Sequence, residues 1–367
     1  MSLTPQEISQ LCQIAEIFDL SGKLENVQPV TNGHINLTYR AEIDGQEYIL
    51  QRINGYVFNR PQDIMENIEK VTAHISKKLE AEGRDPQRGT LNYLRTKDGH
   101  NYVVDDDGNF WRVCPYIAGT CSYEQVENLH MLESAGYAFG EFQRMLSDFP
   151  MDDLNETIAD FHNTEKRLND FFAAVEADAA GRAKDVAEEI QFFADRRESA
   201  GKFTGMQARG ELPLRVTHND TKYNNILIDV ETSDAVCVVD LDTVMPGLSV
   251  YDFGDAIRFA ASTALEDETD LSKVTINMEY FEAFTKGFME ASNGAFTETE
   301  IANMAQGCIN ITIELASRFL MDHINGDKYF AIHRPNHNLD RARNQIKVAL
   351  EMEKHLDEMN AIVRKYA

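Results

Sequence analysis

LRVTHNDTKYNNILID, residues 214–229, and VCVVDLDTVMPG, residues 236–247, form a strand-rich island in a half of the chain whose other segments have helical periodicity. Each segment contains a short apolar run rich in β-branched residues, which predicts strands at 226–228 and 236–239. Polar side chains lie at the ends of these runs: His218, Asp220, Lys222 and Asn225 before the first, and Asp240 directly after the second. Such side chains often only cap turns, but their joint spacing at two strand ends favours a shared chemical role.

The polar residues of this island are the smallest set of groups that can move a phosphoryl group from a nucleotide to an alcohol. Asp220 can accept the hydroxyl proton, and Lys222 can neutralise charge that develops on the phosphoryl group. Asn225 and Asp240 offer the hard oxygen ligands that Mg²⁺ takes when phosphates fill its remaining positions. The island therefore predicts a phosphoryl-transfer site with Mg²⁺ as cofactor.

The spacing within this loop is close to that of the catalytic loop of protein kinases, in which His, Asp and Asn occur in the same order. His218, Asp220 and Asn225 fit that spacing, and we interpret His218 as a buried structural residue. The tail differs, because Leu-Asp-Thr follows Asp240 where a protein kinase has Phe-Gly, and no Ala-Pro-Glu comes after it. The next motif is SVYDFGDAIRF, residues 249–259.

Three separated motifs, HNDTKYNNIL (218–227), VVDLDT (238–243) and VYDFGD (250–255), resemble the aminoglycoside phosphotransferase and choline kinase superfamily of small-molecule kinases. HNDTK and VVDLDTVMPG are most similar to the N-acetylhexosamine 1-kinases, which phosphorylate the anomeric hydroxyl of N-acetylglucosamine and N-acetylgalactosamine with ATP and Mg²⁺. The resemblance implies a bilobal α+β fold like that of protein kinases. It also implies the following roles: Asp220 as catalytic base, Lys222 beside the transferring phosphate, Asn225 and Asp240 as Mg²⁺ ligands, and Asp252 as a brace of the catalytic loop.

The resemblance extends over nearly the whole chain and implies that the nucleotide binds its N-terminal part. NGHINLTYRAE (32–42) resembles the hairpin that covers the nucleotide, which makes Asn32 and Gly33 candidate contacts. FWRVCPYIAGT (110–120) resembles the hinge between lobes, where backbone groups from Pro115 to Ile117 would pair with adenine. A proline at this point removes one backbone donor.

The third strand of that family, YILQRIN (48–54) in this chain, lacks the lysine that usually contacts the phosphates. Gln51 and Arg52 point to opposite faces of a strand, and either could face the nucleotide. Arg52 can pair with phosphate oxygens as a lysine does and is the candidate ligand. Glu66 or Glu69, on a helix expected at 61–83, would be the ion-pair partner. The missing lysine leaves a non-catalytic nucleotide-binding protein as an alternative.

Further residues lie at positions that look equivalent to the sugar pocket of these kinases: His34, Thr243, Phe259, Arg318 and Tyr329. An aromatic ring can pack on a sugar face, and an arginine can donate to hydroxyl or carbonyl oxygens. Together with Asp220 they form the predicted substrate site, for a neutral sugar. A cationic acceptor such as an amino alcohol or an aminoglycoside would need carboxylates around it, so a kinase of another small-molecule hydroxyl is the nearest alternative.

The periodicity of the rest of the chain changes near residue 117. Before that point, alternating apolar and polar residues broken by Asn-Gly and Asp-Gly turns predict an antiparallel sheet with one inserted helix. After it, the pattern predicts helices at 123–148, 272–294, 298–326 and 339–366, and a packed helical pair at 163–205. We therefore expect a small nucleotide-covering lobe, residues 1–117, and a larger, mostly helical catalytic and substrate lobe, residues 118–367.

The 367 residues carry a formal net charge of −26, and no Lys/Arg-rich run offsets it. Such a surface repels polyanions, so neither nucleic acid nor an anionic membrane is an expected partner. The five cysteines are scattered and no run of apolar residues is long enough to span a membrane, so we expect a cytoplasmic protein. The resemblance to the N-acetylhexosamine 1-kinases implies a role in carbohydrate metabolism. ATP is itself a polyanion, so Mg²⁺ and a few cations must create a local positive field for it.

Overall fold

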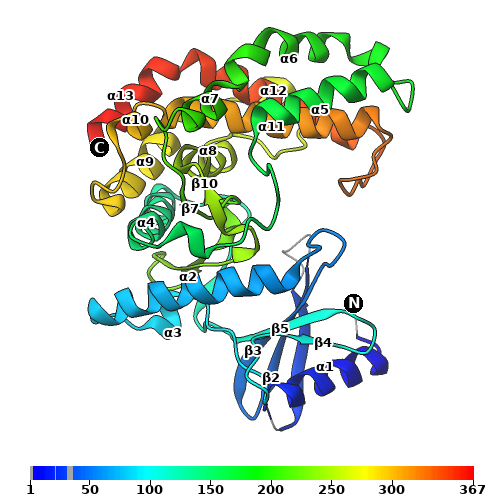
Figure 1. Ribbon diagram of the computed structural model, residues 1–367, viewed down its shortest axis with the longest axis vertical. Helices are drawn as coiled ribbons and strands as arrows, with labels where there is room; N and C mark the ends of the chain where they lie inside the picture. Colours follow the sequence, from blue (N-terminus) through cyan, green and yellow to red (C-terminus); the bar gives the residue numbers. More distant parts are fainter. Residues whose placement is uncertain (1–2, 21, 31–35) are drawn as a thin grey trace.

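A computed structural model describes residues 3–20, 22–30 and 36–367, and it has two lobes (Figure 1). The predicted contacts Asn32, Gly33 and His34 lie outside the described residues. The N-terminal lobe is an antiparallel sheet of order β1-β2-β3-β5-β4 with helices on it. Its elements are α1 (Pro5–Ile17), β1 (Leu24–Val30), β2 (Leu37–Ile43), β3 (Gln46–Ile53), α2 (Pro61–Ala81), α3 (Pro86–Gly89), β4 (Val103–Val104) and β5 (Phe110–Pro115).

The two faces of the N-terminal sheet have different partners. One face packs on α1, and its buried core includes Leu50 and Trp111 together with Leu11 of the helix. The other face contributes Ile53 and Cys114 to a second core that also contains α2 and residues of the C-terminal lobe. Side chains of a strand alternate between its two faces, so each side chain of β3 or β5 faces either α1 or the side where the lobes meet.

The C-terminal lobe is mostly helical, and two small sheets lie in it next to the N-terminal lobe (Figure 1). Helices of this lobe are α4 (Leu129–Met145), α5 (Thr164–Ala177), α6 (Ala187–Ala200), α7 (Lys202–Ala208), α8 (Ser249–Ala260), α9 (Met278–Ser292), α10 (Glu298–Ile301), α11 (Met304–Ile324), α12 (His337–Lys354) and α13 (Leu356–Tyr366). Short 3-10 turns are η1 (Met151–Asp153), η2 (Ala183–Val186), η3 (Tyr223–Asn225), η4 (Leu241–Thr243) and η5 (Leu271–Lys273). Strands are β6 (Thr120–Cys121), β7 (Arg215–Thr217), β8 (Ile226–Asp229), β9 (Ala235–Val238) and β10 (Met245–Gly247).

The expected bilobal α+β class is confirmed, and the two strands of the island are β8 and β9, paired in an antiparallel hairpin. The structure adds β7 and β10, which pair with each other and frame the catalytic loop. The last expected helix, 339–366, is divided at His355 into α12 and α13. The chain passes from the N-terminal sheet into the C-terminal lobe between Pro115, where β5 ends, and Thr120, where β6 begins.

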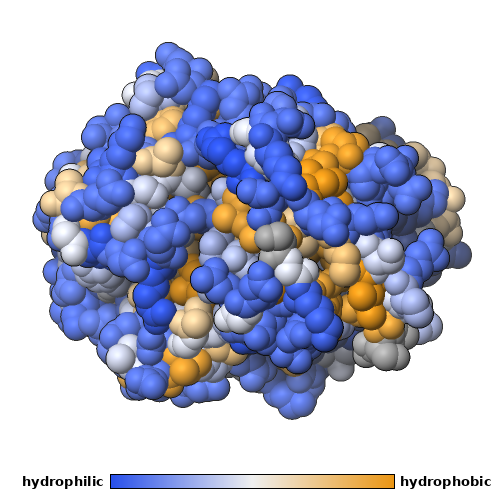
Figure 2. Space-filling view, turned by 90° about the horizontal axis from the view of Figure 1, so that it is seen from below, coloured by the Kyte–Doolittle hydropathy of each residue, from blue (hydrophilic) through white to orange (hydrophobic). Residues whose placement is uncertain are grey.

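The surface of the N-terminal side is mostly hydrophilic, with apolar patches between polar ones (Figure 2). Within the described ranges, no helix is both long and apolar enough to cross a membrane.

Helices α4 and α9 approach each other so closely that three glycines form the contact. A Cβ built on Gly136 or Gly140 of α4 would lie 2.1 Å from a carbonyl oxygen of α9, and one on Gly287 would lie 1.9 Å from the carbonyl oxygen of Glu133. These are backbone atoms, which cannot move aside as a flexible side chain can. The pair packs behind the catalytic loop, since the Phe139 ring of α4 contacts the His218 ring.

Gly140→Ala is therefore expected to destabilise the protein by about 1–3 kcal/mol, because the methyl group forces the two helices apart. Urea unfolding measures the change. Gly55→Ala is the control, since its Cβ would have no atom within 4 Å. An unfolding free energy of Gly140→Ala equal to that of the control would contradict the close packing.

Candidate active site

The catalytic loop is held by a buried carboxylate from helix α8. The Asp252 oxygens accept hydrogen bonds from the backbone N–H groups of His218 and Asn219, each at 2.8 Å, and its backbone carbonyl accepts the Thr221 hydroxyl. Burial raises the pKa of Asp252, although the hydrogen bonds it accepts oppose that effect. Asn219 adopts a left-handed backbone, with φ of 63°, so these bonds stabilise a conformation that is otherwise unfavourable. Asp252 thus does what the resemblance implies.

His218 is fully buried, and its two ring nitrogens have different roles. Nε2 lies 2.9 Å from the Val239 carbonyl oxygen and must donate to it. Nδ1 accepts the Asp220 backbone N–H at 3.3 Å, so it carries no proton. A neutral ring that joins the loop to β9 has a structural role, in agreement with the interpretation from sequence.

Asp220 is surrounded by groups that stabilise its charged form. Its Oδ2 lies 3.1 Å from the Lys222 ammonium and accepts the Asn225 amide at 3.1 Å. Burial raises the pKa of Asp220, but Lys222 and Asn225 outweigh it and hold the pKa below its ordinary 3.8. In the described part of the chain no hydrogen bond reaches Oδ1 of Asp220. The carboxylate is therefore ionised, and one of its oxygens can accept the hydrogen of an acceptor hydroxyl.

Asp240 follows β9 and lies among like charges. Burial, followed by the carboxylates of Asp242 and Asp220, raises its pKa to about 6. No described residue forms a hydrogen bond or an ion pair with the Asp240 side chain, and no described residue donates a hydrogen bond to the Asn225 side-chain oxygen. A carboxylate and an amide oxygen without donors fit a hard cation such as Mg²⁺. Among the described residues no three His, Cys, Asp or Glu side chains could hold a metal by themselves, so phosphate oxygens would have to complete the coordination.

The structure corrects the prediction for the third strand. Arg52 is paired with Trp111 across β3 and β5, on the face that packs on α1, which is away from the C-terminal lobe. Gln51 is on the inner face, where its side-chain oxygen accepts the Arg112 Nε–H at 2.8 Å. Arg112 is 1% exposed and forms an ion pair with Asp242 of the C-terminal lobe. The buried cation of the N-terminal lobe is therefore Arg112, from the neighbouring strand β5.

The ion pair expected with a glutamate of α2 is also absent from the described structure. Glu66 pairs with Lys70, and Glu69 pairs with Arg95 and accepts from the Asn101 amide. In the described structure neither glutamate reaches Gln51, Arg52 or Arg112. What α2 presents to Arg112 is the Met65 sulfur, at 3.7 Å.

Among Pro115, Tyr116 and Ile117 of the hinge, one backbone donor is available in the described structure. The Tyr116 N–H donates to the Glu47 carbonyl at 2.9 Å, and the Ile117 carbonyl accepts the Thr120 hydroxyl at 2.6 Å. Pro115 has no N–H. The Ile117 N–H has no acceptor among the described residues. Adenine pairing at Pro115 and Ile117 stays a prediction with this donor as its candidate.

The four described residues of the predicted acceptor pocket do not all lie together. Arg318 and Tyr329 do, because both line a cavity of about 360 Å³ that Arg167 and Phe330 also line. Phe259 lines a different cavity, of about 310 Å³, together with Glu124 and Tyr280. Thr243 is buried, and its hydroxyl donates to the His218 carbonyl at 2.7 Å, so the side chain holds the catalytic loop.

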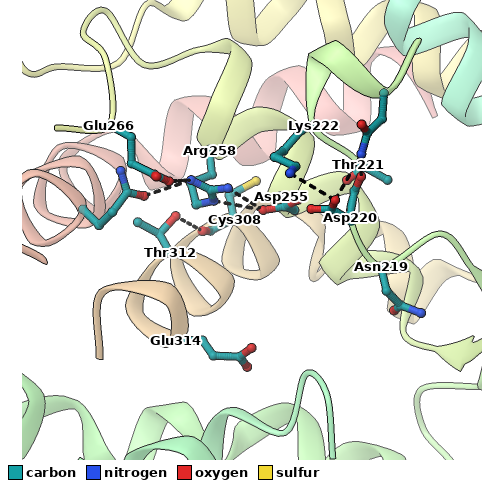
Figure 3. A network of polar contacts seen from close by, with 12 residues as sticks. Asn219, Asp220, Thr221, Lys222, Asp255, Arg258, Glu266, Cys308, Thr312 and Glu314 are labelled. Carbon is teal, nitrogen blue, oxygen red and sulfur yellow. Dashed lines mark hydrogen bonds and ion pairs between the residues drawn. The ribbon is translucent and has the colours of Figure 1, made fainter. Parts of the chain in front are cut away.

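Several polar residues of the site were not singled out from the sequence. Asp255 and Arg258 form a buried pair at 2.9 Å, and Arg258 also contacts Glu266 (Figure 3). Asp255 lies within electrostatic range of Lys222 and helps to raise its pKa, although Asp220 has the larger effect. Asp242 and Asp255 stand inside the quoted motifs, so their acidity was a visible signal. Arg112, His162 and Glu314 carry no local signal, because their partners are far away in the sequence.

The loop and hairpin thus bring together an ionised carboxylate, a neighbouring ammonium, and a carboxylate and an amide oxygen without donors, in a fold of two lobes. The model of the phosphotransferase enzyme family (APH) matches residues 26–275, and the chain belongs to that family. Its phosphotransferase chemistry with a hydroxyl acceptor follows from this membership.

Solved structures share the fold at low sequence identity. A microcompartment-associated aminopropanol kinase has a TM-score of 0.66 and 15% identity, and the match covers 96% of this chain and 98% of that one. Spectinomycin phosphotransferase in complex with ADP and spectinomycin has a TM-score of 0.61 and 12% identity, with coverage of 98% and 100%. Choline kinase from Streptococcus pneumoniae has a TM-score of 0.56 and 10% identity, with coverage of 95% and 99%. Identities this low establish the fold alone.

Proposed function

We propose that the protein transfers the γ-phosphoryl group of ATP to the anomeric hydroxyl of an N-acetylhexosamine. The observation that carries the choice of acceptor is the cavity around Arg318. The guanidinium carbon of Arg318 lies 5.9, 5.9 and 5.6 Å from the ring centroids of Phe161, Tyr329 and Phe330. Rings that pack on sugar faces and a guanidinium that donates to hydroxyl and acetamido oxygens suit a polar, uncharged acceptor.

The same cavity is unfavourable for a cation. It is lined by the cationic residues Arg167, Arg318 and Lys328. Its one carboxylate, Asp322, already accepts the backbone N–H groups of Lys328, Tyr329 and Phe330 and the Asn338 amide. An ammonium group would therefore meet like charge and no available counter-ion.

The cavity is connected to the catalytic loop through two adjacent residues. The Phe161 ring centroid lies 5.9 Å from the guanidinium carbon of Arg318, which lines the cavity, and the next side chain, His162, contacts the Asn219 carbonyl at 2.9 Å. Asn219 immediately precedes the proposed base, Asp220. This relay of contacts is the observation that supports placing the acceptor between Arg318 and Asp220.

In the proposed mechanism, the free oxygen of Asp220 orients the C1 hydroxyl and receives its proton as the sugar oxygen bonds to the γ-phosphorus and the bond to ADP breaks. Lys222, which pairs with the other oxygen of Asp220, stabilises charge on the transferring group. Asn225 and Asp240 would hold Mg²⁺, which when bound screens the phosphate charges. Asp252 and Thr243 keep the loop in place during the transfer.

A coupled assay of ADP release with Mg-ATP and a panel of acceptors tests the proposal. N-Acetylglucosamine and N-acetylgalactosamine should be turned over, and free glucose, choline and ethanolamine serve as comparisons. Arg318→Gln should raise the acceptor KM about tenfold while the KM for ATP stays within about twofold. Arg364→Gln, on the last helix, is the matched control. No turnover of either acetamido sugar would exclude the proposed acceptor.

An amino alcohol is the second candidate, and the cavity at Phe259 favours it. Glu124 lines that cavity with Phe259 and Tyr280, which is a combination of a carboxylate and rings that suits an ammonium group, whereas Glu266 is already paired there with Arg258. The structural relatives include kinases of aminopropanol and choline. Turnover of choline or ethanolamine that is lost in Glu124→Gln and retained in Arg318→Gln would assign the acceptor to this cavity.

ATP binding should depend steeply on Mg²⁺, because the proposed phosphate site contains Asp220, Asp240 and Asp242 in a chain of net charge −26. Chelation should weaken ATP binding about tenfold or more in calorimetry, equivalent to about 1.4 kcal/mol. Asp240→Asn should weaken Mg-ATP binding and strengthen binding of metal-free ATP, since it removes both a ligand and a repelling charge. ATP affinity that chelation leaves unchanged would contradict this.

A further inference from the structure

A buried chain of polar side chains connects the catalytic loop to three helices of the C-terminal lobe. His162, in the loop before α5, lies 2.9 Å from a Glu314 oxygen through Nδ1 and 2.9 Å from the Asn219 carbonyl oxygen through Nε2. The side chains of His162 and Glu314 are 12% and 1% exposed. The second Glu314 oxygen accepts the Thr164 hydroxyl at 2.8 Å, and that hydroxyl lies 2.9 Å from the Tyr251 hydroxyl.

The chemistry of these contacts fixes where the protons lie. A carbonyl oxygen and a carboxylate both accept hydrogen bonds, so His162 satisfies both neighbours only when both ring nitrogens carry a proton. A ring with a single proton must leave one neighbour without a donor. The carboxylate competes better for that proton than the carbonyl does, so the contact with Asn219 is the one that is lost.

The surroundings of His162 favour the charged ring. Burial lowers its pKa, but the Glu314 carboxylate, the Asn219 carbonyl and Asp255 outweigh it and hold the pKa above the ordinary 6.5. Asp252 and the Tyr251 ring also face it from α8, and Arg167 lies within electrostatic range of Glu314. Because the pKa is raised, the doubly protonated ring is lost only as the pH rises through a value above 6.5.

We propose that His162 and Glu314 are positioning residues, which hold the Asn219 carbonyl so that Asp220 keeps its place as the base. Asn219 has its N–H bound by Asp252 and its carbonyl bound by His162, which fixes a left-handed residue from both sides. Neither residue reaches the reacting atoms through its own contacts. The inference rests on the phosphoryl-transfer chemistry of the proposed function and is independent of which hydroxyl is the acceptor.

Replacements of the pair separate this role from a merely structural one. In Glu314→Gln the amide accepts the Thr164 hydroxyl and donates to Nδ1, which leaves the single ring proton for Asn219. That variant should therefore keep its activity at alkaline pH. Thr164→Val removes a donor to Glu314 and makes the carboxylate a stronger acceptor, so the loss of activity should move to higher pH. His162→Gln cannot carry the charge and should be slower than the wild type at neutral pH, where the wild-type contact with Asn219 is intact.

The test is the single-turnover rate of the full chain with Mg-ATP across about pH 6 to 10. The wild type should lose activity on the alkaline side, Glu314→Gln should show no such loss, and Thr164→Val should show it at higher pH. His162→Gln should be about tenfold slower at neutral pH without an alkaline loss, and with the KM for ATP within about twofold. His74→Gln, which removes a pair with Asp148 far from the loop, should follow the wild type.

Failure of the inference and failure of the proposed acceptor are distinguishable. If the wild type turns over no sugar, the same profiles are measured on its hydrolysis of ATP, which needs the same loop. A wild-type rate that is flat at alkaline pH, or an alkaline loss that persists unchanged in His162→Gln or Glu314→Gln, would overturn the inference. Thermal melts identify a variant that does not fold. If one of the other variants does not fold, Thr164→Val still tests the inference, because its alkaline loss of activity should occur at higher pH than that of the wild type.

Discussion

Asp220→Asn is expected to reduce kcat by about 10³-fold, because the amide fills the same space but cannot accept the acceptor proton. Mg-ATP affinity should change little, since the substitution leaves Asn225 and Asp240 in place. The ADP-release assay measures kcat, and calorimetry measures nucleotide binding. The pairing of Lys222 and Asn225 with one Asp220 oxygen makes the other oxygen the candidate contact of the acceptor.

Asp234→Asn is the matched control for this substitution, because Asp234 is an exposed carboxylate of the same lobe that contacts only surface groups such as His130. It should have wild-type kcat. If Asp220→Asn retained phosphoryl transfer at a comparable rate, the assignment of the base would be wrong. If it lost Mg-ATP binding as well, Asp220 would belong to the nucleotide site instead.

Arg112→Met is expected to lower the free energy of unfolding by about 3–5 kcal/mol, because it leaves the buried Asp242 carboxylate without its counter-ion. Arg112 and Asp242 are 1% and 2% exposed, and they come from different lobes. Burial lowers the pKa of Arg112, but Asp242 more than compensates and raises it overall, so the guanidinium stays charged. Urea unfolding followed by circular dichroism measures the loss.

The double variant Arg112→Met/Asp242→Asn should recover part of that stability, because it removes the uncompensated charge together with its partner. Arg209→Met is the control, since Arg209 forms an exposed pair with Glu211 whose loss should cost less than about 1 kcal/mol. Additive effects of the two single substitutions would show that Arg112 and Asp242 do not stabilise each other across the lobes.

Apolar runs, turn residues and the spacing of polar residues along the chain predicted much of the fold and the catalytic loop. Apolar runs at 226–228 and 236–239 became β8 and β9, because short β-branched segments bounded by turn residues have few alternatives to a strand. The spacing of His218, Asp220 and Asn225 predicted that they lie together, since residues within one tight loop stay together in any fold that forms it. The inserted helix also formed, from Pro61, which is favourable in a first helical turn.

The third strand shows where such reasoning ends. Alternation placed Gln51 and Arg52 on opposite faces, but it could not say which face meets the C-terminal lobe. That depends on where α1 and α2 pack, and α1 covers the side of Arg52. Thr243 shows the same limit, because a hydroxyl in a motif can serve the backbone beside it as well as a ligand.

Asp220, Lys222, Asn225 and Asp240 are close together along the chain, so their shared loop and hairpin could be predicted from the sequence, and the resemblance of their motifs implied a two-lobed phosphotransferase. The groups that support them are brought there by tertiary packing alone. Arg112 meets Asp242 across 130 positions, and His162 meets Glu314 across 152. Contacts at such separations arise from the packing of whole helices and strands. That packing depends on the apolar faces of many elements together, so no single segment of sequence predicts it.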